Sequence, residues 1–277
     1  MEHKNSLKRK LGEASFVGVK KPKTPEELVE WFRHLYAYKY ASIFAHGKIM
    51  LDVGCGTGYG ASELSAAAQI VIGIDIWREG IIYCHLRYGD RASFIRASAL
   101  NLPFRENIFD LVTSFQVIEH INAKMVNLYL EEVKRVLKNG CTFIVATPNR
   151  KLRLLPFQKP WNPEHKKEYD AKEFDRTLEM VFKNSKVFGL FATEKAYLIE
   201  YYRVRQNPLF VYILSPLFHI IKRFIPNFFL QTMKRIMARK TNKSKNVGNR
   251  YEISIEDFEL SRENLGSCLD LYGICRK

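Results

Sequence analysis

The sequence lacks the cysteine pattern of a disulfide framework or a zinc site. Its 277 residues include five cysteines, an odd number, with no Cys-x-x-Cys pair. They are Cys55, Cys84, Cys141, Cys268 and Cys275. Such a set is typical of a protein kept in a reducing compartment. The seven histidines show no metal-ligand spacing either, so the sequence predicts no bound metal.

Long apolar runs are absent as well. The longest uncharged run, 206–221, has 16 residues and holds two prolines. A membrane-spanning helix needs about 20 apolar residues, so we expect no span. Residues 1–23 are basic and lack the apolar stretch of a secretory signal, and they fit a frayed tail or a nuclear-import signal. We expect a cytoplasmic protein, with the inner face of the membrane as an alternative location.

Acidic residues are missing from one long segment. Between Tyr201 and Arg250 there is no Asp or Glu, although the whole chain carries a formal net charge of +15. The segment contains eleven basic residues: Arg203, Arg205, Lys222, Arg223, Lys234, Arg235, Arg239, Lys240, Lys243, Lys245 and Arg250. This pattern favours a local anionic partner. The segment fits a contact with an anionic membrane surface or a helical lid with a solvated basic face; RNA binding is a third reading, without a recognised module.

Short apolar runs alternate with helical patterns along the rest of the chain. A helix is predicted from Thr24, with Pro25 at its first position, toward Ala45, and another over Ala123–Leu137. The strand candidates are Ile49–Val53, Ile70–Ile74, Ser93–Ala97, Leu111–Phe115, Thr142–Ala146, Val187–Thr193 and Leu269–Cys275. Strands and helices alternating at this interval indicate an α/β fold, a doubly wound, mostly parallel sheet covered on both faces.

The same patterns predict how the chain is organised. With 47% hydrophobic residues, it can bury one substantial core but not two full-size domains. We expect a basic tail over 1–23, a core over 24–195, a basic apolar insertion over 196–264, and a last core strand over 265–277. The sequence gives no indication of the oligomeric state.

A glycine-rich turn follows the first predicted strand. Gly54, Gly56 and Gly58 let the backbone turn tightly and lie against a ligand without Cβ contacts. The next strand ends in Asp75, 21 residues beyond Gly54, where a carboxylate can bind both hydroxyls of a ribose. These features alone also fit a dinucleotide-binding loop, because Gly56, Gly58 and Ala61 match Gly-x-Gly-x-x-Ala.

Three further features separate these nucleotide-binding classes. Asp52 precedes the first glycine by two, where an acid suits a ligand with a cationic amino-acid end. Leu102-Pro103-Phe104 is followed by Asn107-Ile108-Phe109-Asp110-Leu111-Val112 and by Val117-Ile118-Glu119-His120, and residues 131–140 then lead into the fifth strand. In this order the motifs resemble the class I S-adenosylmethionine-dependent methyltransferases, specifically the type 11 group around the ubiquinone-biosynthesis O-methyltransferases. The likeness covers roughly residues 35–182.

The resemblance implies a Rossmann-like sheet of seven strands with a reversed last strand, and S-adenosylmethionine as methyl donor. It assigns donor binding to the glycine loop and to the ends of the following strands: Asp52, Gly54, Gly56, Gly58, Asp75, Ile76, Ser98, Ala99 and Phe115. Ser98-Ala99 departs from the Asp-Ala that this family usually places beside the adenine amino group. A serine can still accept a hydrogen bond there, more weakly than a carboxylate.

The catalytic side chain is less clearly marked. For a hydroxyl acceptor a general base accelerates transfer by about 10²–10⁴-fold. His165 is the best candidate because it lies in a polar, aromatic loop beyond the fifth strand, where ligands bind in such sheets. The loop pattern, Asn-Pro-x-His-x-x-Glu-Tyr, resembles that of bacterial family members linked to envelope sugars and glycolipids. His120, after Glu119 at a strand end, is a second candidate; both histidines also fit structural roles.

We therefore expect S-adenosylmethionine-dependent methyl transfer, at oxygen, to a small-molecule, lipid-linked or sugar-linked acceptor. One alternative is an RNA-directed methyltransferase that uses the basic 201–250 segment. Another is a non-catalytic protein that only binds S-adenosylmethionine. Methylation of nucleobase amino groups is disfavoured, because Ser114-Phe115-Gln116-Val117 follows the fourth strand instead of the Pro-Pro-aromatic motif of such enzymes.

Overall fold

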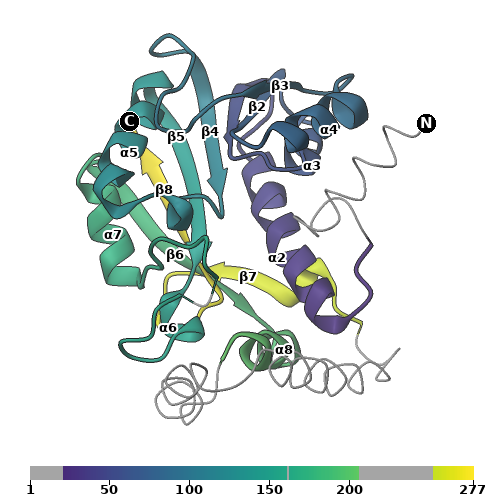
Figure 1. Ribbon diagram of the computed structural model, residues 1–277, viewed down its shortest axis with the longest axis vertical. Helices are drawn as coiled ribbons and strands as arrows, with labels where there is room; N and C mark the ends of the chain where they lie inside the picture. The colour runs from purple at the N-terminus through teal and green to yellow at the C-terminus, as the bar shows by residue number, and fades with distance from the viewer. Residues whose placement is uncertain (1–20, 161, 206–251) are drawn as a thin grey trace, which may run out of the picture.

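The computed structural model describes residues 21–160, 162–205 and 252–277. Within them the centre of the fold is an eight-stranded sheet in the order β3-β2-β1-β4-β5-β8-β6-β7 (Figure 1). The strands are β1 Ile49–Val53, β2 Ile70–Asp75, β3 Ser93–Arg96, β4 Phe109–Phe115, β5 Leu137–Pro148, β6 Asn184–Ala192, β7 Phe258–Ser261 and β8 Asp270–Arg276. From β3 through β5 all neighbouring strands pair in parallel, whereas β8 runs antiparallel to both β5 and β6.

This topology confirms the predicted α/β fold with a mostly parallel sheet and a reversed last strand. The predicted number of seven strands was too low by one, because β7 adds an antiparallel edge to β6. The strand has four residues, Phe-Glu-Leu-Ser, of which only Phe258 is buried. So short a strand at a sheet edge leaves almost no apolar periodicity in the sequence.

Helices cover the sheet on both sides. One core cluster packs under α2 (Pro25–Ser42), α3 (Tyr59–Leu64), α4 (Arg78–Tyr88) and α8 (Glu194–Val204). The other packs under α5 (Val126–Val136) and α7 (Ala171–Glu179). A short helix, α6 (Arg150–Arg153), follows β5. None of the helices in the described ranges is long and apolar enough to cross a bilayer.

The predicted helix starts agree with the local chemistry. Thr24 caps α2, its Oγ1 accepting a hydrogen bond from the Glu27 amide at 3.2 Å, and the helix ends at Ser42, ahead of the predicted Ala45. The second predicted helix is divided, since 123–125 form a 3₁₀ turn, η2, before α5 begins. A second 3₁₀ turn, η1 (Ile118–His120), follows β4 and enters the site described below.

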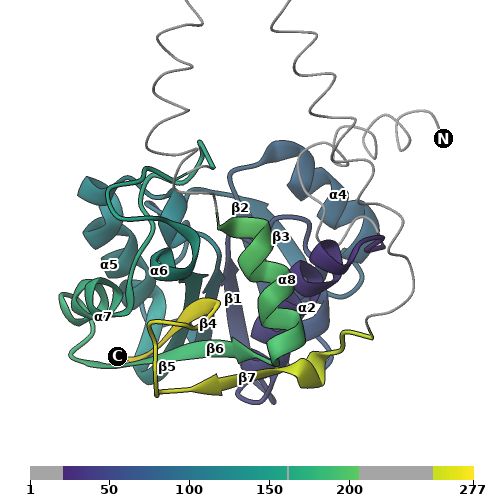
Figure 2. The same ribbon diagram turned by 90° about the horizontal axis from the view of Figure 1, so that it is seen from below.

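Both ends of the predicted insertion pack onto the core. Helix α8 lies beside α2 (Figure 2) and is joined to it by a buried ion-pair network. In that network Arg33 contacts Glu200 of α8 and Asp270 of β8. The rest of the insertion, with most of its basic charge, lies outside the described residues, as do residues 1–20. The predicted domain boundaries stay predictions.

Candidate active site

The glycine loop joins β1 to α3, and its three glycines all have left-handed backbone angles. The φ angles are +77° at Gly54, +54° at Gly56 and +76° at Gly58. A Cβ at Gly54 would come within 2.3 Å of Val117, and one at Gly58 within 2.7 Å of the Cys84 sulfur. A Cβ at Gly56 would meet no protein atom within 4 Å. Packing therefore requires the first and third glycines, while the second faces the open space where a ligand would lie.

Asp75 holds this loop from the end of β2. One carboxylate oxygen accepts from the Gly56 amide at 2.9 Å and the other from the Trp77 amide at 2.8 Å. Because a carboxylate oxygen has two lone pairs, each can also accept a hydrogen bond from a ribose hydroxyl. The position of Asp75 is thus compatible with its predicted contact with ribose, which stays a prediction.

A cavity of about 1210 Å³ opens in front of the loop. Most of the predicted donor-binding residues line it, namely Gly54, Gly56, Asp75, Ile76, Ser98, Ala99 and Phe115. Single ligands occupy pockets of about 300–1,000 Å³, so this cavity has room for a donor and an acceptor together. Gly58 supports the loop from behind, outside the cavity wall.

Asp52 also lies behind the wall. It is fully buried, and its carboxylate accepts hydrogen bonds from the Tyr38 hydroxyl at 3.2 Å and the Thr113 hydroxyl at 2.9 Å. Burial raises the pKa of Asp52 to about 7, although both hydrogen bonds oppose the rise. This placement gives the carboxylate two side-chain partners in the protein, and a direct contact with a cationic ligand end stays a prediction. Asp52 fixes Tyr38, whose ring lines the cavity and packs edge-on against Phe115 at 5.0 Å.

Trp77 and Gln116 are among the cavity residues that were not predicted from the sequence. Trp77 follows Ile76 along the wall next to Asp75. Gln116, just after β4, has a φ of +59°, which is uncommon outside glycine and costs about 1–2 kcal/mol. Strained residues of this kind cluster at functional sites. A non-glycine residue does not reveal such a backbone angle in the sequence.

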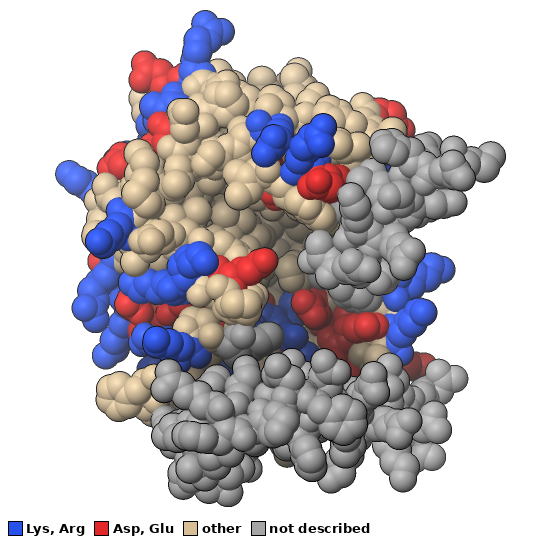
Figure 3. Space-filling view, viewed as in Figure 1, with Lys and Arg blue, Asp and Glu red and all other residues tan. Residues whose placement is uncertain are grey.

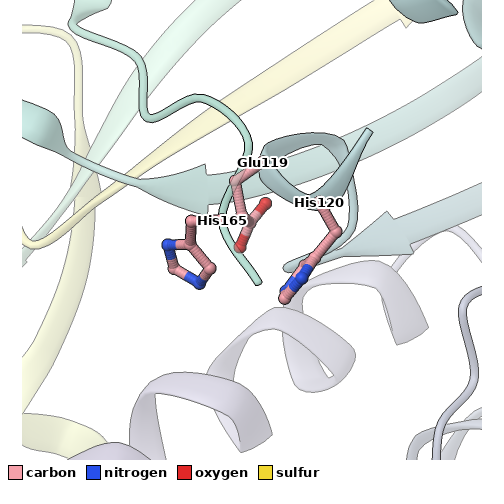
Figure 4. Close-up of side chains that lie close together, drawn as sticks. All are labelled: Glu119, His120 and His165. Carbon is pink, nitrogen blue, oxygen red and sulfur yellow. The ribbon is translucent and has the colours of Figure 1, made fainter. Parts of the chain in front are cut away.

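At the far end of the cavity the two predicted catalytic histidines lie in contact with each other. His120, the second candidate, is the one that lines the cavity. His120 lines the cavity, whereas His165 lies behind it, with ring centroids 4.8 Å apart and ring planes at 82° (Figure 4). The side chain of His165 is only 7% exposed. His165 is not among the lining residues, so a role of His165 at the acceptor stays a prediction.

His165 is held in place by a buried acid. Its Nδ1 lies 2.7 Å from Oε1 of Glu168, which also lies 3.3 Å from Nε of Arg153. Burial and the neighbouring His165 lower the pKa of His120. Sequence reasoning gave no role to Glu168, although its spacing of three from His165 was visible in the loop motif.

Glu119 completes the group from beneath. Its side chain is 0% exposed, with Oε2 accepting from the Thr147 hydroxyl at 3.0 Å, and burial raises its pKa to about 8. Its carbonyl accepts from the amides of Lys166 at 2.7 Å and Lys167 at 3.1 Å. These two bonds fasten the loop of His165 to the η1 turn.

Comparison with known proteins agrees with this geometry. Residues 51–145, from β1 into β5, match the family model described as a methyltransferase domain. A probable S-adenosylmethionine-dependent methyltransferase of Mycolicibacterium smegmatis is 34% identical over 163 residues, 58% of this chain and 62% of that relative. This chain carries a class I S-adenosylmethionine-dependent methyltransferase domain. Of the two ligands compatible with the glycine loop, the match favours S-adenosylmethionine over a dinucleotide.

Two further similar proteins are a curated enzyme and a protein of known structure. A fatty-acid O-methyltransferase of Mycolicibacterium smegmatis is 33% identical over 122 residues, 43% of this chain and 44% of that relative. A solved S-adenosylmethionine-dependent methyltransferase of Thermotoga maritima, a possible histamine N-methyltransferase, shares the fold with a TM-score of 0.56. It is 15% identical, and the match covers 90% of this chain and 91% of that one. The chain spans about 60% of the length of the first curated relatives, 62% of one and 58% of another.

Proposed function

We propose that this protein transfers the methyl group of S-adenosylmethionine to an oxygen atom of a lipid or lipid-linked acceptor. The observation that carries the proposal is the single cavity, whose two ends differ in chemistry. One end holds the glycine loop and Asp75, and the other holds His120 with the apolar Ile121 and Met125 and the polar Asn122, Glu164 and Lys166. Both reactants can therefore meet in one space.

At the donor end, side chains and backbone groups of this chain bind and orient S-adenosylmethionine. S-adenosylmethionine supplies an already activated methyl group when bound. The carboxylate of Asp75 suits the ribose hydroxyls, and the open face of Gly56 admits the donor against the backbone. Ser98 and Ala99 line the region proposed for the adenine.

At the acceptor end we assign the contact with the acceptor oxygen to His120. His165 and Glu168 act as positioning residues behind it. Relatives named for lipid acceptors support the class of substrate: besides the fatty-acid enzyme, a phthiotriol/phenolphthiotriol dimycocerosates methyltransferase of Mycobacterium ulcerans is 37% identical over 97 residues, 34% of this chain and 35% of that relative.

A membrane surface suits such an acceptor, and we propose that the protein docks on anionic bilayers. The chain from 201 to 250 carries eleven basic residues and no acid. Among the described residues, Phe157 is fully exposed at 104%, in the loop after α6, with exposed Lys159 in the same loop and exposed Lys151 in α6. Lys and Arg side chains gather on the lower left of the face in Figure 3, over α6 and α7. An exposed aromatic ring among cations is typical of a segment at the membrane interface.

Methyl transfer is tested with S-adenosylmethionine carrying a deuterated methyl group. The purified protein is incubated with it and with a long-chain fatty acid, a glycolipid extract or bulk RNA, and the products are analysed by mass spectrometry. We expect label in a lipid fraction, and less label with the Asp75→Ala variant at a donor concentration that does not saturate it. Label in RNA alone would replace the lipid proposal by the RNA-directed one. Calorimetric binding of NAD without S-adenosylmethionine would overturn the donor.

Docking is tested by co-sedimentation with vesicles. We expect binding to anionic but not to neutral liposomes, weakened by salt because each cation near the surface contributes about 1 kcal/mol that salt screens. Changing Lys222, Arg223, Lys234 and Arg235 to Gln should reduce binding. Equal binding to neutral and anionic vesicles, or none to either, contradicts the docking surface.

A further inference from the structure

We infer that Glu119, His120 and His165 form a binding site for a divalent transition-metal ion at the acceptor end of the cavity. The inference deepens the proposed function and rests on it in one respect, that the ion would bind the acceptor oxygen. It departs from the expectation of no metal, which followed from the absence of ligand spacing in the sequence.

The three side chains come from two segments and converge. Glu119 and His120 belong to η1, and His165 to the loop before α7 (Figure 4). One potential ligand atom from each lies within 4.8 Å of the other two. With metal–ligand bonds of about 2.0–2.2 Å, tetrahedral ligands stand about 3.3 Å apart. Rotation of the His120 side chain would bring its ring nitrogen closer to the other two ligand atoms, while His165 keeps its bond to Glu168.

An unsatisfied buried atom points to a ligand at this place. Oε1 of Glu119 has no hydrogen-bond partner within the described ranges, although the side chain is completely buried. A buried carboxylate oxygen left without a partner is costly, and each such atom in a folded protein needs an explanation. A cation bound between Glu119 and the two rings supplies that partner.

The surroundings hold the ligands as metal sites commonly do. Metal-binding histidines use one ring nitrogen for the ion and give the other to a carboxylate or carbonyl, which fixes the ring. Nδ1 of His165 is bound to Glu168 in this way, leaving Nε2 for an ion. The Glu119 carbonyl ties both segments together through the amides of Lys166 and Lys167, so the ligands are fixed relative to one another.

Two imidazoles and one carboxylate favour Zn²⁺, Co²⁺, Mn²⁺ or Fe²⁺ over Mg²⁺ and Ca²⁺, which prefer oxygen ligands. His120 lines the cavity, so an ion held by the three side chains would lie within reach of the acceptor and would supply Lewis-acid chemistry that lowers the pKa of its hydroxyl. The hydroxyl proton would pass to water, and the oxygen electron pair would form the bond to the methyl carbon as the carbon–sulfur bond breaks, leaving the neutral thioether.

The experiment titrates Co²⁺ into tag-free wild-type protein and follows visible absorption, with Zn²⁺ added afterwards in competition. We expect one Co²⁺ per chain with d–d bands of nitrogen and oxygen ligation, displaced by Zn²⁺. His165→Ala and Glu119→Gln should weaken binding at least tenfold, and Glu168→Gln by about 10–100-fold. The matched control is His46→Ala, which removes an exposed histidine far along the chain from the cluster and should bind as wild type.

Absence of stoichiometric binding to the wild type overturns the inference, even if some variants fail to fold. So does binding that folded variants of the three residues leave unchanged. Calorimetry with S-adenosylmethionine on the same samples separates the two proposals. Donor binding without cobalt binding removes the metal site alone, and cobalt binding without donor binding removes the methyl-transfer proposal.

Discussion

Replacing Gly56 by alanine should lower both stability and donor affinity, the first through backbone strain and the second because the added Cβ occupies space in the cavity. Its φ of +54° is left-handed, a conformation that costs a residue with a side chain about 1–2 kcal/mol. For a chain of this length that corresponds to a melting temperature lower by about 2–8 °C. The added Cβ meets no protein atom within 4 Å, so packing adds no further cost. It does enter the cavity where the donor would lie, and we expect affinity for S-adenosylmethionine to fall at least tenfold, or about 1.4 kcal/mol.

Gly47 offers a matched control. It has a φ of +67°, a Cβ there would also meet nothing within 4 Å, and it lies in the loop before β1, outside the cavity wall. Gly47→Ala should therefore lower the melting temperature by a similar amount and leave donor affinity unchanged. Calorimetry for affinity and scanning calorimetry for stability measure both quantities. Wild-type donor affinity in Gly56→Ala, or equal losses in both variants, would refute the placement of the donor over the loop.

Two further predictions concern the acids around the loop. Asp75→Ala should weaken binding of S-adenosylmethionine by about 1.5–3 kcal/mol, measured by calorimetry, because charged hydrogen bonds to ribose are lost; an unchanged affinity would exclude the ribose contact. Asp52→Asn should remove a pH dependence of stability, because the folded-state pKa of Asp52 is raised from 3.8 to about 7. The stability from this group is present below about pH 4 and is lost as pH rises through about 7, up to about 4 kcal/mol in all. The melting temperature of the wild type should thus fall more than that of Asp52→Asn between these values, and parallel curves would contradict the buried, protonated state.

The donor half was largely predictable from the sequence because its parts are local. A strand, a glycine turn and an acid at the end of the next strand carry their geometry in their order along the chain. Gly56 and Asp75 lie 19 residues apart, yet adjacent parallel strands necessarily bring their ends together. Asp52 shows the limit of prediction from local sequence. The sequence places this acid at the end of β1, but only packing determines that its carboxylate binds the Tyr38 and Thr113 hydroxyls.

At the other end of the cavity the sequence identified both histidines, but it did not indicate which of them lines the cavity. Both His120 and His165 were marked, but 45 positions separate them, and no local pattern says which ring stands in front. The order is set by the hydrogen bonds from the amides of Lys166 and Lys167 to the Glu119 carbonyl. Backbone contacts between two irregular segments have no periodicity, so neither the layering of the histidines nor the partnership with Glu119 could be derived from spacing.

This difference in construction has a functional consequence. The donor end is made from the ends of β1 and β2, which pair along five successive residues and cannot shift without disturbing the sheet. The acceptor end is made from η1 and a loop joined mainly through Glu119, its carbonyl to the loop and its carboxylate to Thr147 of β5. Changes in that loop can alter the acceptor while the donor site stays intact. Glu119 connects the sheet to the loop of His165. Its carboxylate oxygen Oε2 is bound to Thr147 of β5, and its Oε1, which has no partner within the described ranges, lies beside the two histidines.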